Sequence, residues 1–459
     1  MKADFSRDTF DPLRHFSRVL VQQGRLQLDA DVNEQSSILL HYLRTLAQDL
    51  IGEHGGPGTG FQIGKSDQPS MDFRILPGRY YVNGVLCEND AADFSYSKQG
   101  LPAIAPNKTH FVYLDVWERH VSALDDDSLR DVALGQADTT SRAQVMWKVR
   151  VASKAPDGTD LPPFGPDGFG AWFADSGWPD AWVAQWQPPQ RGLLRAMGRA
   201  AATPDTRPCI ISPEARFRGL ENQLYRVEIH TGGLAKQASF KWSRDNGSVT
   251  FAIKALAADG TATLASAGRG DRQALRRNDW VELVDDDAAL RGEAGPLALV
   301  LSVQPDELTV KLKPAGGAAM PGYAPEDFAK KHVQLRRWDY RVNTPSSANT
   351  ASTKPQQADD GALRIQEDKW LALEDGVQVM FANPAEGQPA HVYRQGDCWF
   401  FAARTATGDV EWPGDVGNPE ALPPKGVLHY YAPLGMIGAN GTEVVDVASF
   451  RRTIKPAAE

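Results

Sequence analysis

Short runs of β-branched and aromatic residues, alternating with polar ones, recur through most of the chain after residue 72. This alternation is the pattern of a strand that buries one face in a core. Two Asn-Gly pairs, Asn83-Gly84 and Asn246-Gly247, each separate two such runs and predict tight hairpins. We therefore expect a mainly β chain, in which an N-terminal helical segment is followed by several antiparallel β-sandwich or barrel-like modules. The expected strands are residues 73–75, 79–82, 85–87, 111–117, 224–229, 239–243, 249–253, 279–284, 297–303, 363–373, 377–381 and 398–402.

The N-terminal stretch, residues 15–52, has a different period. Four leucines recur there at spacings of four, three and four, which places them in one narrow stripe on a helix. The spacing matches the a and d positions of a coiled coil for about two heptads. We expect this helix to run from about residue 30 to residue 50 and to be the longest in the chain. The four leucines are Leu39, Leu43, Leu46 and Leu50.

Residues at the two ends of the stripe support these limits. Asp29 or Asp31 can cap the start of the helix, and Glu34 stands three residues after Asp31, as in a capping box. Gly52 can end the helix, because glycine readily adopts the backbone conformations found at helix ends. Before the helix, residues 16–21 form a short apolar clasp that precedes a glycine hinge.

The stripe needs a partner, because a helix of two heptads is marginal in water on its own. It is too narrow for a helix sunk into a globular core, but it suits a seam between like helices. The seam is then buried either on the chain's own body or on other copies. We expect a homo-oligomer, a trimer with the helices at its axis. The predicted interface comprises Phe16, Val19, Leu20, Leu39, Leu43, Leu46 and Leu50.

The same N-terminal residues carry a family resemblance. Residues 16–35, FSRVLVQQGRLQLDADVNEQ, are similar to the opening of a family of uncharacterised proteins encoded in bacterial contractile injection system and phage-tail-like gene clusters. They resemble, more loosely, the start of phage baseplate and tail-fibre proteins. Residues 222–253, 396–413 and 426–434 stand in that family's order, so the resemblance covers nearly the whole chain. It implies a structural component, a baseplate, tail-fibre or adaptor protein, that attaches to other particle proteins through its N-terminal helix.

A second class of function is a cargo protein of the same particle that acts on or binds a glycan. Residues 156–208 are rich in Pro, Gly and Trp, and three tryptophans share one helical face by i, i+4 spacing. We expect a short aromatic helix that docks on a neighbouring domain or subunit, with stacking on a cell-surface glycan as the alternative. The candidate aromatic contact surface is Trp172, Trp178, Trp182 and Trp186.

Charge and hydropathy exclude two classes of partner. The net charge is -9 and basic residues form only short pairs such as Arg276-Arg277, which argues against nucleic acid. The sequence contains no run of 18 apolar residues and no apolar signal core at its start, so we expect no membrane span. We expect synthesis in the cytoplasm and assembly into a particle that can be released from the cell.

Neither the cysteines nor the short sequence motifs indicate a catalytic or metal-binding site. Cys87, Cys209 and Cys398 are far apart in apolar surroundings, which indicates reduced core thiols rather than a disulfide framework or a zinc site. The patterns G-x-S-x-G, H-E-x-x-H and G-x-G-x-x-G are absent. Residues 125–127 lack the alternation of a calcium loop, and the tripeptide at residues 269–271, Arg-Gly-Asp, is short enough to arise by chance.

The most suggestive polar set is His429, Tyr430 and Tyr431, with Arg404 and Asp409 nearby in the sequence. Such residues can line a polar cleft, but polar pairs across neighbouring strands explain them as well. We therefore expect no catalytic residue, no cofactor and no bound metal.

Shifts in composition divide the chain into segments. The clearest boundary is the Ser/Thr/Pro-rich run that begins at Asn343. The expected segments are a helical attachment and oligomerisation segment (1–60), a small antiparallel β domain (61–155), a Pro/Gly/Trp-rich insertion (156–208), a β-sandwich or barrel domain (209–342), a polar linker (343–362) and a C-terminal β domain (363–459).

Overall fold

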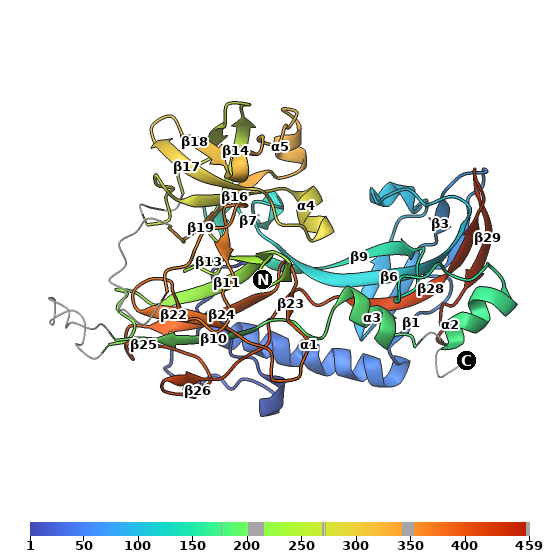
Figure 1. The fold of residues 1–459 in the computed structure, drawn as a ribbon, viewed down its shortest axis with the longest axis horizontal. Coiled ribbons are helices and arrows are strands. Elements are labelled where there is room, and N and C mark those ends of the chain that lie inside the picture. Colours follow the sequence, from blue (N-terminus) through green and yellow to red (C-terminus); the bar gives the residue numbers. More distant parts are fainter. Residues whose placement is uncertain (176, 201–214, 269, 271, 342–352, 456–459) are drawn as a thin grey trace. The chain divides into compact units, whose positions relative to one another are not determined.

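A computed structural model describes residues 1–175, 177–200, 215–268, 270, 272–341 and 353–455. The chain forms two compact units, and each is assembled from three separate stretches of sequence. Strands predominate in both units (Figure 1), which confirms the prediction of a mainly β chain. Unit 1 comprises residues 1–8, 120–142 and 190–426, and unit 2 comprises residues 9–119, 143–189 and 427–459.

The longest described helix, α1, spans Asp29–Ile51 in unit 2 and confirms the helix predicted from the leucine stripe. The backbone N–H of Leu28 donates to the carboxylate of Asp31 over 3.2 Å, so Asp31 acts from within the first turn and is not the capping residue. Glu34 does not close a capping box, because its carboxylate accepts a threonine hydroxyl from the preceding segment. Gly52 ends the helix with a φ of 90°.

The first predicted hairpin is confirmed, and it lies directly against α1. Strands β4 (Gly78–Val82) and β5 (Val85–Asn89) are joined by Asn83 and Gly84, whose φ values are 48° and 76°. A Cβ atom on Gly84 would lie 2.2 Å from the carbonyl oxygen of Arg44 in α1. Only glycine permits this approach, so the turn packs against the helix backbone.

The strands of unit 2 enclose one core. A four-stranded sheet has the order β29-β28-β6-β9, a three-stranded sheet has the order β1-β4-β5, and β2 pairs with β3. Along β6, Val112 and Leu114 enter the core, whereas Phe111 and Tyr113 lie on the other face. Both faces of β6 are therefore buried. The bounds are β1 (His54–Gly55), β2 (Ile63–Lys65), β3 (Phe73–Ile75), β6 (Lys108–Val121), β9 (Arg142–Ala152), β28 (Tyr430–Ala439) and β29 (Val444–Ser449).

Unit 1 contains a β-sandwich with an aromatic core. A five-stranded sheet of order β20-β13-β11-β24-β25 shares this core with a three-stranded sheet of order β10-β22-β21. Phe240 of the first sheet contacts Phe381 of the second, with ring centroids 5.0 Å apart. The bounds are β10 (Leu193–Gly198), β11 (Gln223–Thr231), β13 (Ser239–Ser243), β20 (Leu363–Arg364), β21 (Leu371–Ala372), β22 (Val377–Ala382), β24 (Cys398–Arg404) and β25 (Asp409–Val410).

Unit 1 also contains a closed antiparallel barrel of order β14-β15-β18-β17-β16-β19. Its interior is filled by apolar side chains, among them Val281, Val300 and Leu335, as expected for so small a barrel. The bounds are β14 (Thr250–Leu256), β15 (Thr261–Leu264), β16 (Trp280–Val284), β17 (Leu297–Gln304), β18 (Thr309–Pro314) and β19 (Gln334–Trp338).

The second predicted hairpin does not form. Asn246 and Gly247 have φ values of 51° and 67°, as a tight turn requires, but the flanking strands β13 and β14 lie in different sheets. The two edges of β13 are taken by β11 and β20, and those of β14 by β15 and β19. The module expected for residues 209–342 is therefore divided between the sandwich and the barrel.

The C-terminal β domain expected for residues 363–459 does not form either. Strands β20, β21, β22, β24 and β25 complete the sandwich of unit 1, whereas β28 and β29 pair with strands of unit 2. The expected linker, residues 343–362, lies outside the described residues up to residue 352. Its second half is part of the sandwich, because Asp360 accepts hydrogen bonds from the hydroxyls of Thr231 and Ser239.

The other helices and strands are short. Within the described residues, no helix combines the length and the apolar character needed to span a bilayer. These elements are α2 (Ala171–Asp175), α3 (Asp180–Trp186), α4 (Asp286–Arg291), α5 (Asp327–Lys330), β7 (Arg130–Asp131), β8 (Ala137–Asp138), β12 (Gly233–Leu234), β23 (Val392–Tyr393), β26 (Gly414–Asp415) and β27 (Asn418–Pro419).

Candidate functional site

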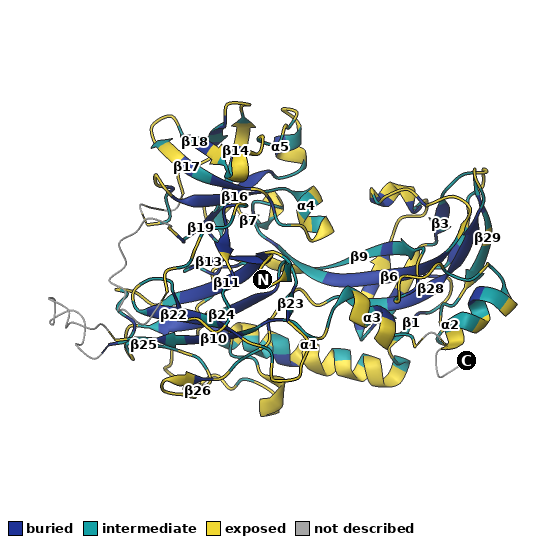
Figure 2. Ribbon diagram, in the orientation of Figure 1, coloured by how far each residue is buried: buried dark blue, intermediate teal, exposed yellow. Residues whose placement is uncertain are grey.

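The leucine stripe of α1 is exposed along the helix. Ala30 and Ile38 are buried on the opposite face, and Leu43 in the stripe exposes 62% of its surface. Figure 2 shows α1 largely in the colour of exposed residues. The stripe is thus not packed on its own unit, and packing on other copies stays a prediction. The exposed apolar residues of α1 are Val32, Leu39, Leu40, Tyr42, Leu43, Leu46 and Leu50.

The segment before α1 extends this apolar surface. We name residues 12–28 the arm; apart from one helical turn at Pro12–Arg14, it forms neither helix nor strand. The N–H of Val19 donates to the side-chain carbonyl of Gln35 over 2.8 Å, which attaches the arm to α1. Leu26 is 90% exposed. The exposed apolar residues of the arm are Leu13, Phe16, Leu20, Val21, Leu26 and Leu28.

A cavity of about 250 Å³ lies where the arm meets α1. Phe16, Ile38 and Tyr42 line it with apolar surface, and Glu34 adds a carboxylate. The cavity is smaller than the sites of about 300–1,000 Å³ that bind small molecules. We name the exposed face of α1, the arm and this cavity the N-terminal apolar surface.

The predicted aromatic surface faces the protein. Trp182 on α3 is fully buried, and its ring lies 4.7 Å from that of Phe111 on β6. Trp186 stacks on Tyr113 at 4.1 Å. The neighbour that α3 docks on is thus the four-stranded sheet of its own unit, and these two rings already stack on protein rather than on a sugar. The other members, Trp172 and Trp178, are half-buried in the same cluster.

Unit 1 contains a buried ionic cluster that was not predicted from the sequence. The ammonium of Lys241, which is buried, lies 3.4 Å from Glu228 and 2.8 Å from Glu282. Lys2 and Arg226 lie 2.8 and 2.7 Å from Glu228. Burial alone would raise the pKa of Glu228, but these three cations hold it well below its usual range. The carboxylate of Glu228 is therefore a buried anion at the centre of the cluster.

Two further side chains complete this cluster. The carboxylate of Glu282 accepts the indole N–H of Trp338 over 2.9 Å, and Lys241 lies 4.6 Å above the same indole ring. Burial, together with the charge of Lys241, lowers the pKa of His230 to about 4. In the sequence, the cluster is marked by the alternation of charged residues along β11. A strand with one face in water has the same alternation, so the pattern does not distinguish the two cases.

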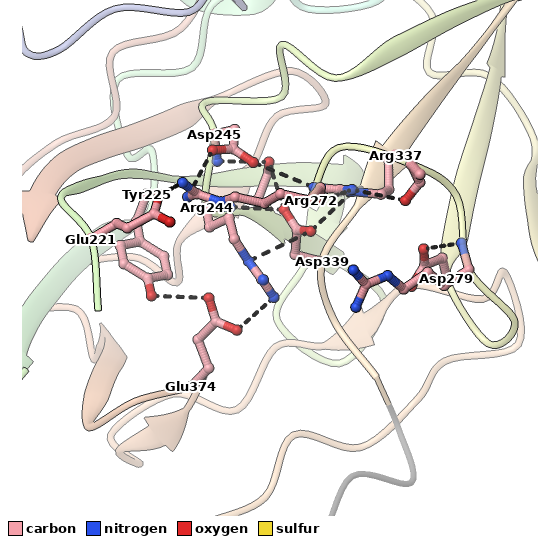
Figure 3. Close-up of polar contacts among 12 residues, drawn as sticks. Glu221, Tyr225, Arg244, Asp245, Arg272, Asp279, Arg337, Asp339 and Glu374 are labelled. Carbon is pink, nitrogen blue, oxygen red and sulfur yellow. Dashed lines mark hydrogen bonds and ion pairs between the residues drawn. The ribbon is translucent and has the colours of Figure 1, made fainter. Parts of the chain in front are cut away.

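A second ionic network joins the sandwich to the barrel (Figure 3). Arg244, which follows β13, lies 2.7 Å from Glu374 and 3.7 Å from Asp339. Arg337 on β19 lies 3.2 Å from Asp339 and 3.4 Å from Asp245. The network thus alternates cations and anions between the two bodies of unit 1, and we assign it a role in holding them together.

Two carboxyls of this network have raised pKa values. Burial is the main cause for Glu374, whose pKa is raised to about 7 although Arg244 acts in the opposite direction. Burial and the neighbouring charge of Asp339 raise the pKa of Asp245 to about 6. Glu374 also accepts the hydroxyl of Tyr225 over 3.0 Å. These groups titrate near neutral pH, so the network is sensitive to pH.

The polar set around His429 is divided by the fold. The Nδ1 atom of His429 lies 2.6 Å from a carboxylate oxygen of Asp115 on β6, and the other oxygen lies 2.7 Å from Arg150 on β9. Arg404 and Asp409, its neighbours in sequence, belong to unit 1. The structure therefore places His429 in a polar cluster with Asp115 and Arg150, which lie on neighbouring strands of its own unit.

The thiols are buried where they are described. Cys87 and Cys398 are free and buried, and burial raises the pKa of Cys87 to about 12. Cys209 lies outside the described residues, as do Arg269 and Asp271 of the Arg-Gly-Asp tripeptide. In the part of the chain that the structure describes, no three His, Cys, Asp or Glu side chains are grouped so that they could hold a metal ion.

Of the comparisons with known proteins, the one with family models finds a match. No curated protein and no solved structure matches the chain. A family model matches residues 1–161 and 187–451, which is well over half of the sequence. The gap between the matched ranges, residues 162–186, holds the tryptophan segment that covers β6. The chain belongs to DUF6519, a family of unknown function.

Proposed function

We propose that the chain is a structural component, a baseplate, tail-fibre or adaptor protein, of a contractile-injection or phage-tail-like particle. The observation that carries the proposal is the exposed leucine stripe of α1. Soluble monomers rarely expose a continuous apolar surface of this kind, and such surfaces mark contacts with other proteins. The 23 residues of α1 extend over about 34 Å at the usual helical rise. This length is sufficient for an attachment element.

The stripe has the form of a self-complementary seam. Leu43 and Leu50 take the a positions of a heptad, and Leu39 and Leu46 take the d positions. Identical helices can meet there without repulsion, because the flanking e and g positions along the middle of the stripe are uncharged. We therefore propose a homotrimer with α1 at its axis, synthesised in the cytoplasm and assembled with other particle proteins. The uncharged flanking residues are Gln35, Leu40, Tyr42 and Ala47.

Attachment is tested with a charge placed in the stripe. Leu43→Asp adds a carboxylate to a surface that is exposed in the single chain, so the chain folds but cannot bury that position in a seam. Leu134→Asp is the matched control, because Leu134 is 63% exposed and lies in unit 1. We expect wild type and Leu134→Asp to sediment with the assembled particle and Leu43→Asp to stay free. Retention of Leu43→Asp at the wild-type level contradicts the proposal.

A polysaccharide panel tests the second class of function. A structural component has no reason to cleave or bind members of the panel. Depolymerising activity of the purified chain, or saturable binding to one glycan, would favour a glycan-acting or glycan-binding cargo protein instead.

A further inference from the structure

The arm and α1 carry opposite charges. The arm contains three arginines and no acidic residue, so its net charge is +3. Four acidic residues and one arginine give α1 a net charge of −3, with its histidine neutral. The charged residues are Arg14, Arg18 and Arg25 in the arm, and Asp29, Asp31, Glu34, Arg44 and Asp49 in α1.

Within one chain these opposite charges do not meet. The three arginines are exposed, and among the described residues none of them forms an ion pair. Arg14 lies over the ring of Phe16, 4.4 Å from its centroid. The arm is attached to its own helix by backbone hydrogen bonds, from the N–H of Val19 to the side chain of Gln35 and, at the junction with α1, from that of Leu28 to Asp31. Phe16 of the arm also lines the cavity beside the helix. The arm thus presents three cations and several apolar side chains to the surroundings of the chain.

We propose that the arm of one copy lies along α1 of a second copy. Its apolar side chains then cover the exposed flank of that helix, and its arginines face the acidic residues there. The cavity beside Tyr42 receives one apolar side chain of the incoming arm, which the cavity volume of about 250 Å³ accommodates. A second copy fits this surface because it brings the charge of +3 that complements the charge of −3 on α1. The inference rests on the self-association in the proposed function, and it specifies what covers the flank of the helix.

The arm and the helical seam use different faces of α1. The seam runs through Leu43 and Leu46. The cavity is lined by Ile38, His41 and Thr45, which lie to one side of that stripe, and by Tyr42, which flanks it. One helix can therefore contact like helices at the axis and hold the arm of a neighbour on its flank. The arm contact adds an electrostatic component that the middle of the seam lacks, because the residues that flank it there are uncharged.

Charge reversal in the arm tests this contact in the full-length protein. The arm variant, Arg18→Glu with Arg25→Glu, changes the net charge of the arm from +3 to −1. The control, Lys254→Glu with Arg277→Glu, changes the net charge of the whole chain by the same amount, at exposed sites in unit 1. Light scattering over a concentration series gives the dissociation constant of self-association. We expect the dissociation constant of the arm variant to rise about tenfold or more, because like charges then face each other across the interface. The dissociation constant of the control should change little. High salt should weaken the parent and not the arm variant.

Cross-linking between copies tests the geometry. Each chain carries Cys209→Ser, because Cys87 and Cys398 are buried and Cys209 is not described. Leu20→Cys protein is mixed with Tyr42→Cys protein and oxidised, so a mixed disulfide can form only between two copies. We expect the mixed dimer to exceed both homodimers, and to exceed the yield from Tyr42→Cys with Leu134→Cys.

The outcomes separate the arm contact from the seam. If the arm variant and its charge-matched control associate equally, and no excess of the mixed disulfide forms, the arm contact is wrong. When Leu43→Asp still abolishes association in that case, the seam of the proposed function stands. A parent that is monomeric at all concentrations overturns the arm contact together with the trimer, but it leaves attachment to a different particle protein in place.

Discussion

The ammonium of Lys241 on β13 lies 2.8 Å from the carboxylate of Glu282 on β16, and both side chains are buried. The sandwich and the barrel of unit 1 are thus joined by an ion pair in a place where two β bodies usually meet through apolar side chains. A buried charge that loses its partner keeps its desolvation cost and has no attraction to offset it. The junction therefore depends on both partners being present.

Replacing Lys241 by methionine should destabilise unit 1 strongly. Lys241→Met leaves Glu228 and Glu282 facing each other without the cation between them, at an expected cost of about 3–5 kcal/mol. The double variant Lys241→Met with Glu282→Gln should be less destabilised than the sum of the two single variants, because it removes the orphaned charge as well. Urea unfolding measures all three. Lys311→Met, which breaks the exposed pair with Asp259 on the barrel, is the control and should have little effect.

The carboxyl of Glu374 should make stability depend on pH. Its pKa is raised in the folded chain from 4.5 to about 7, so the folded state holds this proton more tightly than the unfolded state. The resulting stabilisation is complete below about pH 4.5 and is lost as the pH rises through about 7. Glu374→Gln has no such proton, so the variant should gain stability relative to wild type across this interval. Urea midpoints measured below and above the interval test this, and a constant difference between the two proteins would show that Glu374 has an ordinary pKa.

Gly84→Ala should loosen the contact between the first hairpin and α1. Alanine at this position adds a Cβ atom 2.2 Å from the carbonyl oxygen of Arg44, besides the strain of a φ of 76°. Gly100→Ala is the control, because Gly100 has a φ of 67° with open space around it. The control should lose about 1–2 kcal/mol from backbone strain alone. We expect a clearly larger loss for Gly84→Ala in thermal unfolding; equal losses would mean that α1 shifts freely away from the turn.

The thiols of Cys87 and Cys398 should not react with reagents in the folded protein. In a Cys209→Ser background, Cys87 and Cys398 are buried, so an aromatic disulfide reagent should titrate neither of them under native conditions. Both should react once the chain is unfolded in urea. Intact mass without reduction should show no disulfide, and rapid native labelling of either cysteine would contradict their placement.

Local sequence patterns predicted the elements that depend on neighbouring residues. The stripe of α1 needs only the spacing of its leucines, and the hairpin at Asn83-Gly84 needs only two residues that accept a positive φ. The same turn chemistry at Asn246-Gly247 gave the wrong pairing, because the partners of β13 and β14 come from far along the chain. Pairing between distant strands leaves no trace in a local window, so the two discontinuous units could not be foreseen.

The candidate surface was predicted in part. The leucines of α1 were found from their spacing, but the exposure of the arm and the cavity beside Tyr42 depend on how residues 9–28 lie on the helix. The buried ionic cluster was not predicted, for a different reason. Arg226, Glu228 and His230 alternate along β11, and this pattern is identical whether the charged face meets water or the charges of another strand.

The tryptophan segment has a consequence for the evolution of the family. Phe111 and Tyr113 on β6 are buried because residues 162–186 cover them, yet the family match runs through β6 and omits that segment. A chain of the family that lacks the segment would expose these aromatic rings to water. We therefore expect the cover and the aromatic face to be inherited together, with polar residues on this face of β6 in every member that lacks the cover.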